Sequence, residues 1–260
     1  MKKAIVFASF GVVNPEARKA CIDAAARQLQ AAFPDWEVRQ AYTSVFIKKR
    51  LAQQGIQVDS LPEALARLQA DGFTHVAVQP GYLTAGEEYE KKVLQVVQKE
   101  QRNFTQLLVS RPLLERLEDG EDMLPVLQEI FPLPAGEELV LVGHGSPHQH
   151  NPAYENLQKL LDKDGYPAHI GVIEPADTPD FAAVLARLKA RQVKKILLAP
   201  LLLSGGAHVN EDIAGEGAES WLNRLQAAGF SVRVSLRGLG EYPVFQQLYV
   251  KRLQENNPGL

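Results

Sequence analysis

Short apolar runs alternate with longer helical patterns along almost the whole chain, and this alternation constrains the fold more than any other feature. Each apolar run is short enough for one buried strand, and the segments between them repeat apolar residues at helical spacing. Such an alternation is typical of a parallel sheet covered by helices on both faces. In the first half the expected strands are Ala4–Ala8, Val38–Ala41 and His75–Gln79, and the expected helices are Pro15–Ala32, Val45–Gln54 and Glu87–Glu100.

The second half shows the same alternation after a Pro-rich acidic connection, Glu118–Glu138, in which Met123–Ile130 is expected to form a short helix. Its expected strands are Leu139–Val142, Ala168–Ile173 and Lys195–Ala199, and its expected helices are Asn151–Asp162, Pro179–Arg191 and Glu216–Ala228. Ser231–Leu236 and Pro243–Gln254 close the chain.

The two halves align as an internal duplication. Val6–Gly11 matches Val140–Gly145, which places Phe10 opposite His144. The second strands place Thr43 opposite Glu174, and the third place Glu88 opposite His208. We therefore predict an α/β protein of two similar Rossmann-like lobes, with the site in the cleft where the carboxyl ends of their strands meet. The predicted domains are 1–122 and 123–260, with the helix 243–254 packing back on the first lobe.

Composition excludes several function classes. The 260 residues carry 28 basic and 31 acidic side chains, a net charge of −3, so no basic field favours nucleic acid or a membrane surface. The apolar stretch Ala4–Val13 is interrupted by Ser9 and Gly11, which argues against a signal peptide. Cys21 is the only cysteine, so we expect a cytoplasmic protein without disulfides or thiolate metal sites.

Two histidines and one glutamate fall at successive strand ends of the second half. His144, Glu174 and His208 follow its first, second and third strands. A histidine at a strand end is, taken singly, more often an ordinary polar group of a loop, but three such residues at one edge favour a metal site. Imidazole and carboxylate ligands with open positions suit an exchangeable divalent transition metal.

These residues lie in motifs that resemble the sirohydrochlorin cobaltochelatases, class II chelatases of the anaerobic cobalamin pathway. The motifs are Leu141–Ser146, Gly171–Glu174 and Pro200–Asp212, with Ser9–Gly11, Ala41–Ser44, Gly86–Lys91 and Gly238–Glu241 in the same order. The resemblance implies insertion of Co²⁺ into sirohydrochlorin without ATP or another nucleotide. It also implies that His144, Glu174 and His208 hold the metal, and that His144 and His208 are catalytic, with His144 the proton acceptor.

The chemistry of metal insertion explains these residue types. The reaction removes two pyrrole protons and strips water from a cation, so it needs exchangeable ligands and a base with a near-neutral pKa, and histidine provides both. Expected contacts to the tetrapyrrole are Phe10, Tyr82, Glu88 and Ser204, although the aromatic residues Phe10 and Tyr82 also fit an ordinary core. Glu88 has an equally good alternative, because acidic residues also stabilise the first turn of a helix.

Other functions are less well supported. Ser146 is followed by Pro147 and lacks the nucleophile elbow of a hydrolase, and no P-loop is present. A ferrochelatase or nickel chelatase, or a metal or tetrapyrrole carrier without turnover, remains an alternative, and a homo-oligomer is compatible with the sequence. His148 and His150 are expected in a mobile surface loop, and the run Lys48–Arg50 either meets acidic groups of the substrate or is a solvated helix face.

Overall fold

The chain folds into two compact units, each built on its own parallel sheet. A computed structural model describes residues 1–147, 150–206 and 209–257. The first unit comprises Met1–Glu115 together with the chain from Pro243 onward, and the second comprises Arg116–Tyr242. The division thus falls after Glu115 rather than after residue 122, because the segment before α7 (Asp119–Ile130) folds with that helix in the second unit.

The first unit has a four-stranded parallel sheet of order β2-β1-β3-β4. Its strands are β1 (Lys3–Ser9), β2 (Glu37–Tyr42), β3 (His75–Pro80) and β4 (Gln106–Val109). Its helices are α1 (Pro15–Ala17), α2 (Asp23–Ala32), α3 (Val45–Gln53), α4 (Leu61–Ala70), α5 (Glu87–Tyr89), α6 (Gln95–Glu100) and α11 (Pro243–Asn256).

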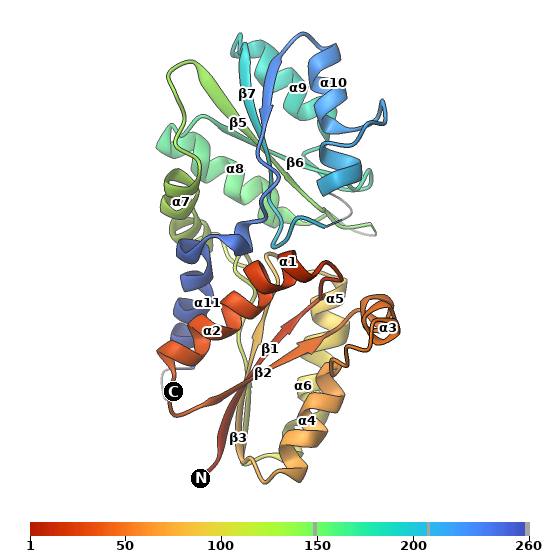
Figure 1. Ribbon diagram of the computed structural model, residues 1–260. Helices are drawn as coiled ribbons and strands as arrows, with labels where there is room; N and C mark the ends of the chain where they lie inside the picture. The colour runs from red at the N-terminus through yellow and green to blue at the C-terminus, as the bar shows by residue number, and fades with distance from the viewer. Residues whose placement is uncertain (148–149, 207–208, 258–260) are drawn as a thin grey trace. The chain divides into compact units, whose positions relative to one another are not determined.

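Alternate residues of β1 face opposite sides of the first sheet and bury against different helices. Ala4, Val6 and Ala8 belong to a core cluster with the apolar face of α4. On the other side, Phe7 makes an edge-to-face contact with Tyr249 of α11, with ring centroids 5.1 Å apart. Figure 1 shows α2 and α11 on one side of this sheet and α4 and α6 on the other. Both faces are therefore covered, as parallel sheets require.

The second unit repeats this order with a sheet β6-β5-β7-β8, again entirely parallel. Its strands are β5 (Glu137–Gly143), β6 (Ala168–Val172), β7 (Lys195–Pro200) and β8 (Ser231–Val234). Its helices are α7, α8 (Pro152–Asp164), α9 (Phe181–Ala190) and α10 (Trp221–Ala227), with α7 and α8 on one side of the sheet and α9 and α10 on the other (Figure 1). The predicted two-sheet α/β class is confirmed.

Several expected elements differ from the observed ones. The expected helices Pro15–Ala32 and Glu87–Glu100 are each interrupted by one π-helical turn, Arg18–Ile22 and Glu90–Leu94. The expected helix from Glu216 begins only at Trp221, because the Ser220 side chain accepts the hydrogen bond that starts it. The sequence patterns did not single out α4 or β4.

Candidate functional site

His144 and Glu174 lie side by side at the carboxyl edge of the second sheet. His144 directly follows β5, and the Glu174 amide donates a hydrogen bond of 2.9 Å to the His144 carbonyl oxygen, which fixes the two backbones. The His144 Nδ1 atom lies 3.7 Å from Glu174 Oε1. The side chains are 39% and 25% exposed, so an incoming ion can reach them.

Side by side, the two residues suit two ligands of one cation, because metal bonds to imidazole nitrogen and carboxylate oxygen are only about 2.0–2.2 Å long. The His144 Nδ1 atom also lies 3.2 Å from the Gly145 carbonyl oxygen, an acceptor that favours a proton on Nδ1 and metal binding through Nε2. No group of three His, Cys, Asp or Glu side chains suited to a metal occurs among residues 1–147, 150–206 and 209–257. The expected third ligand, His208, lies outside the described residues, and a π-helical turn, Val209–Ile213, begins at the next residue. Single π turns inside helices are frequent at functional sites.

Two glycines allow His144 to occupy this position. Gly145 has a φ of +81°, which disfavours other residues, and a Cβ there would lie 3.0 Å from Val172 and 3.1 Å from the Glu174 side chain. A Cβ on Gly143 would lie 2.5 Å from the ring of Tyr154. Gly145 and Gly143 therefore let the loop approach its neighbours closely.

A buried carboxylate that the sequence analysis missed, Asp177, anchors the loop after His144. It is 1% exposed and accepts backbone hydrogen bonds from Ser146 (2.9 Å), Asn151 (3.0 Å) and Thr178 (2.8 Å). The His150 Nδ1 atom lies 3.0 Å from the same carboxylate. His150 is thus tied to this anchor rather than part of a mobile loop, and His148 lies outside the described residues. The only available sequence signal was the position of Asp177 in the loop after β6, in the middle of the proline-flanked segment Pro175–Pro179.

Ser204 lies in the loop after β7, which leads toward His208. A Cβ on Gly238 would lie 2.5 Å from the Ser204 Cα atom, so this backbone contact requires glycine. Ser204 itself is partly exposed, and its carbonyl oxygen accepts a hydrogen bond from the Gly206 amide. The loop is therefore held by the segment after β8, with Ser204 accessible.

In the first unit, three of the expected contact residues lie at the carboxyl edge of the sheet. Phe10 directly follows β1 and is 47% exposed. The hydroxyls of Tyr82 and Thr43 lie 2.5 Å apart, and the Thr43 hydroxyl donates to Glu88 across 3.3 Å. Burial raises the pKa of Tyr82, so its phenol stays protonated and can donate to Thr43. Glu88 therefore accepts a hydrogen bond from the neighbouring strand end besides standing in the first turn of α5.

Equivalent hydrogen bonds correct the predicted alignment of the two halves. The Thr43 amide donates to the Ser9 carbonyl oxygen as the Ile173 amide donates to Gly143. The Ser44 amide likewise donates to Phe10 as the Glu174 amide donates to His144. The residue opposite Glu174 is therefore Ser44 and not Thr43, while Phe10 and His144 stand opposite each other as predicted.

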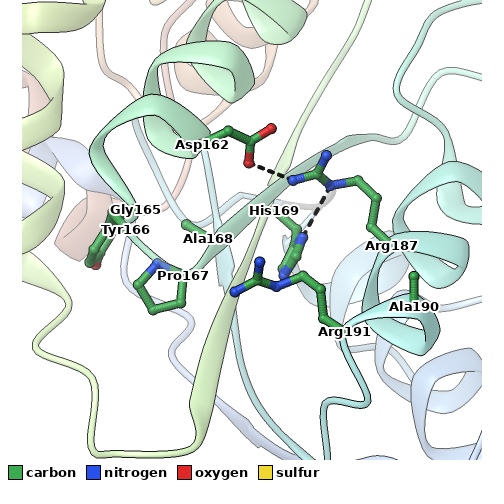
Figure 2. A pocket seen from close by; sticks show the side chains of 9 residues that line it. All are labelled: Asp162, Gly165, Tyr166, Pro167, Ala168, His169, Arg187, Ala190 and Arg191. Atoms are coloured by element: carbon green, nitrogen blue, oxygen red, sulfur yellow. Dashed lines mark hydrogen bonds and ion pairs between the residues drawn. The ribbon is translucent and has the colours of Figure 1, made fainter.

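An open cavity of about 380 Å³ lies at the other edge of the second sheet, around the start of β6. Figure 2 shows the Arg187 side chain between Asp162 and His169. His169 also bonds to Glu138 across 2.5 Å, and Arg191 bonds to the same carboxylate. Burial lowers the pKa of His169, against the opposing effect of Glu138. The charged and imidazole side chains of this cavity are thus bonded within one network, away from His144.

Comparison with known proteins identifies the family. A family model described as cobalt chelatase (CbiK) matches residues 3–257. The chain belongs to this family. Cobalt chelatase relatives include a sirohydrochlorin cobaltochelatase of Salmonella typhimurium, 34% identical over 98% of this chain and 96% of that protein. The sirohydrochlorin cobaltochelatase CbiKC of Nitratidesulfovibrio vulgaris is 35% identical over 97% of this chain and 89% of that protein. The resemblance predicted from the sequence motifs is confirmed.

Solved structures share the fold of this cobalt chelatase family member. SirB from Bacillus subtilis with Fe³⁺ superimposes with a TM-score of 0.64 at 17% identity, covering 99% of this chain and 97% of that one. The structure of CbiX gives a TM-score of 0.56 at 19% identity, covering 97% and 99%. Within the described part of the chain, none of the helices has the length and apolar character needed to cross a bilayer.

Proposed function

We propose that the chain is a sirohydrochlorin cobaltochelatase that inserts Co²⁺ into sirohydrochlorin, in the synthesis of cobalamin and without ATP or another nucleotide. The observation that carries this proposal is the pairing of His144 and Glu174 at neighbouring strand ends of a cobalt chelatase, with the two side chains 3.7 Å apart between Nδ1 and Oε1. His144, Glu174 and His208 hold the ion in this proposal, and His144 and His208 are the catalytic residues.

The proposed ligand set suits an ion that is transferred to the macrocycle rather than retained. Imidazole and carboxylate replace part of the water shell of Co²⁺ without enclosing the ion, so pyrrole nitrogens can displace the remaining waters. The negative charge of Glu174 offsets part of the cost of bringing a dication out of bulk water. Loose and incomplete coordination therefore favours transfer over storage.

His144 accepts one of the two pyrrole protons when the ion leaves, and the other proton passes to water. One imidazole nitrogen cannot hold a cation and a proton together, so proton uptake accompanies release of the ion to the macrocycle. The Glu174 carboxylate at 3.7 Å stabilises the resulting imidazolium. Phe10, Tyr82, Glu88 and Ser204 are the proposed contacts to the tetrapyrrole.

Multiple turnover tests this proposal. The purified protein, given excess sirohydrochlorin and Co²⁺ without nucleotide, is expected to convert many equivalents, followed by the absorbance of the tetrapyrrole. Conversion of only one equivalent would contradict an enzyme and indicate a carrier. Parallel assays with Fe²⁺ and Ni²⁺, and with protoporphyrin in place of sirohydrochlorin, identify the preferred metal and ring. A clear preference for Fe²⁺ or Ni²⁺ would replace cobalt as the substrate metal.

A further inference from the structure

Helix α3 presents an apolar surface to solvent at its first turn. Val45 and Phe46 are 59% and 63% exposed, and Phe10, at the end of β1, is 47% exposed. Large apolar side chains are seldom left so exposed in a cluster unless the surface binds something. The other strongly exposed large apolar residues of the described chain are scattered: Met1, Leu117 and Leu236.

The backbone holds this surface in a fixed arrangement. The Ser44 amide donates to the Phe10 carbonyl oxygen, which brings Phe10 beside the start of α3. The Ser44 side chain caps the helix by accepting from the Ile47 amide across 3.3 Å. Gly11, with a φ of +97°, lets the chain turn against Tyr42 and Ile47. The exposed residues therefore stand on a helix and a strand end rather than on a free loop.

Two cations adjoin the apolar residues. Of the three bases Lys48, Lys49 and Arg50, the first forms an ion pair with Glu63, whose pKa the hydrogen bonds from Lys48 and Ser60 lower to about 2. Lys49 and Arg50 are exposed, and the Arg50 guanidinium lies 5.1 Å from the centre of the Phe46 ring. One helical segment thus offers apolar contact and positive charge together.

We propose that Phe10, Val45, Phe46, Lys49 and Arg50 form a surface, the α3 platform, that binds the sirohydrochlorin substrate. The apolar side chains contact the face of the flat macrocycle, while Lys49 and Arg50 pair with carboxylates on its rim. Charge complementarity selects this occupant, because a macrocycle that carries carboxylates matches an aromatic surface bordered by cations. The inference rests on the proposed function and adds the part of the first unit that recognises the ring.

Removing the apolar contact tests the platform. Phe46→Ser is expected to weaken binding of metal-free sirohydrochlorin about tenfold, because the contact removes much of one aromatic side chain from water. Binding is measured by titration of tetrapyrrole absorbance, and the KM for Co²⁺ is expected to stay unchanged. Leu117→Ser is the matched control, since Leu117 is 60% exposed in the other unit. It is expected to leave binding unaltered.

Removing the positive charges of Lys49 and Arg50 tests the electrostatic part of the α3 platform. The double variant Lys49→Gln with Arg50→Gln is expected to weaken binding several-fold and to flatten its dependence on salt, because exposed ion pairs are screened by salt. Lys99→Gln with Arg102→Gln is the control, because these exposed bases precede β4 and so lie at the opposite edge of the same sheet.

Two outcomes would overturn the platform. Unchanged affinity in both platform variants would show that the macrocycle binds elsewhere. A change in oligomeric state of Phe46→Ser, measured by light scattering, with unchanged affinity would show that this surface meets a second copy of the chain. Failure of the proposed function is separate, because it appears as absent turnover in the unaltered protein, whereas the platform is tested by binding of the metal-free ring.

Discussion

The two units have the same backbone arrangement at the carboxyl edges of their sheets, but the side chains at these edges differ. In each, the residue after the first strand accepts a hydrogen bond from the second residue after the second strand, and is followed by a glycine with positive φ. The first unit places Phe10 and Ser44 at these two positions, and the second places His144 and Glu174 there. One frame of hydrogen bonds thus supports an aromatic side chain and a hydroxyl in one unit and an imidazole and a carboxylate in the other.

The opposite edges differ in a similar way. The strand registers that pair Val6 with Arg39 and Val140 with His169 place these two polar residues at equivalent positions of β2 and β6. Arg39 is ion-paired with Glu37 and Asp71, whereas His169 is buried against Glu138. The equivalent positions therefore carry a permanent charge in the first unit and a titratable group in the second.

Truncating the side chain at the first carboxyl-edge position, that of Phe10 and His144, gives the largest expected effect. His144→Ala is expected to lower kcat about a thousandfold, because it removes the proposed ligand and proton acceptor. Phe10→Ala is the matched variant and is expected to raise the KM for sirohydrochlorin about tenfold with little change in kcat. His208→Ala is expected to behave as His144→Ala does. Steady-state insertion rates measure all three, and circular dichroism checks the fold.

A near-normal kcat in both histidine variants would mean that the metal is held elsewhere. An equal loss of kcat in Phe10→Ala would mean that Phe10 also acts in metal insertion, and not only in binding of the ring.

Asp177 has the next largest expected effect, on stability. Asp177→Ala is expected to lower the free energy of unfolding by about 3 kcal/mol, because three backbone amides, two of them buried, lose their acceptor. Urea unfolding is followed by the fluorescence of Trp221, the tryptophan of the second unit, in a Trp36→Phe background. Glu155→Ala, which removes an exposed carboxylate near His150, is the control. A loss no larger than the control's would show that Asp177 does not anchor the loop.

The two equivalent glycines give a smaller effect that separates stability from activity. Gly145→Ala is expected to destabilise the protein by about 1–2 kcal/mol, because alanine is strained at positive φ. Gly11→Ala is expected to cost somewhat more, because its Cβ would also lie 2.5 Å from the buried ring of Tyr42. Only Gly145→Ala is expected to raise the KM for Co²⁺, since its Cβ would press on Val172 and Glu174. Metal titrations of the two variants measure this difference. Identical metal affinities would contradict the placement of the ion beside Glu174.

The smallest expected effect is a dependence of stability on pH that originates in the second unit. Burial lowers the pKa of His169, so the folded state binds fewer protons there than the unfolded state. The stabilisation is complete above the unfolded pKa of about 6.5 and is lost as the pH falls through the folded value. Urea unfolding is therefore expected to shift to lower urea between pH 7.5 and pH 5, and His169→Gln is expected to reduce the shift. An undiminished shift in that variant would assign the dependence to other groups.

The sequence predicted the alternating elements and the positions of His144 and Glu174 at strand ends because both depend on local patterns. Buried strands such as β5 are continuous apolar runs, and His144 and Glu174 follow their strands directly. The edge strand β4 is short, and its apolar residues carry no helical or alternating pattern that separates it from a loop. Helix α4 has a capping box of Ser60 and Glu63, a local signal that the sequence analysis did not use.

Other features depend on contacts between distant segments and left no local pattern. Asp177 is an anchor only because the loop after β5 folds over it, and nothing in its own segment reveals the amides of that loop. Thr43 was paired with Glu174, one residue out of register, because the two second strands were aligned by residue type. The hydrogen bonds are equivalent when positions are counted from the last residue of each strand. The π-helical turns shift the phase of the apolar pattern, but the pattern on either side of each turn still predicts a helix.

The return of the chain to the first unit has a consequence for its synthesis. Helix α11 supplies Tyr249 and Phe245, whose rings contact each other, and Tyr249 also contacts Phe7 of β1. A ribosome therefore releases the first strand of this core long before the helix that covers it, and the second unit is translated between the two. Because domains tend to fold as they emerge, the second unit can finish while α2 alone covers the side of the first sheet that it later shares with α11.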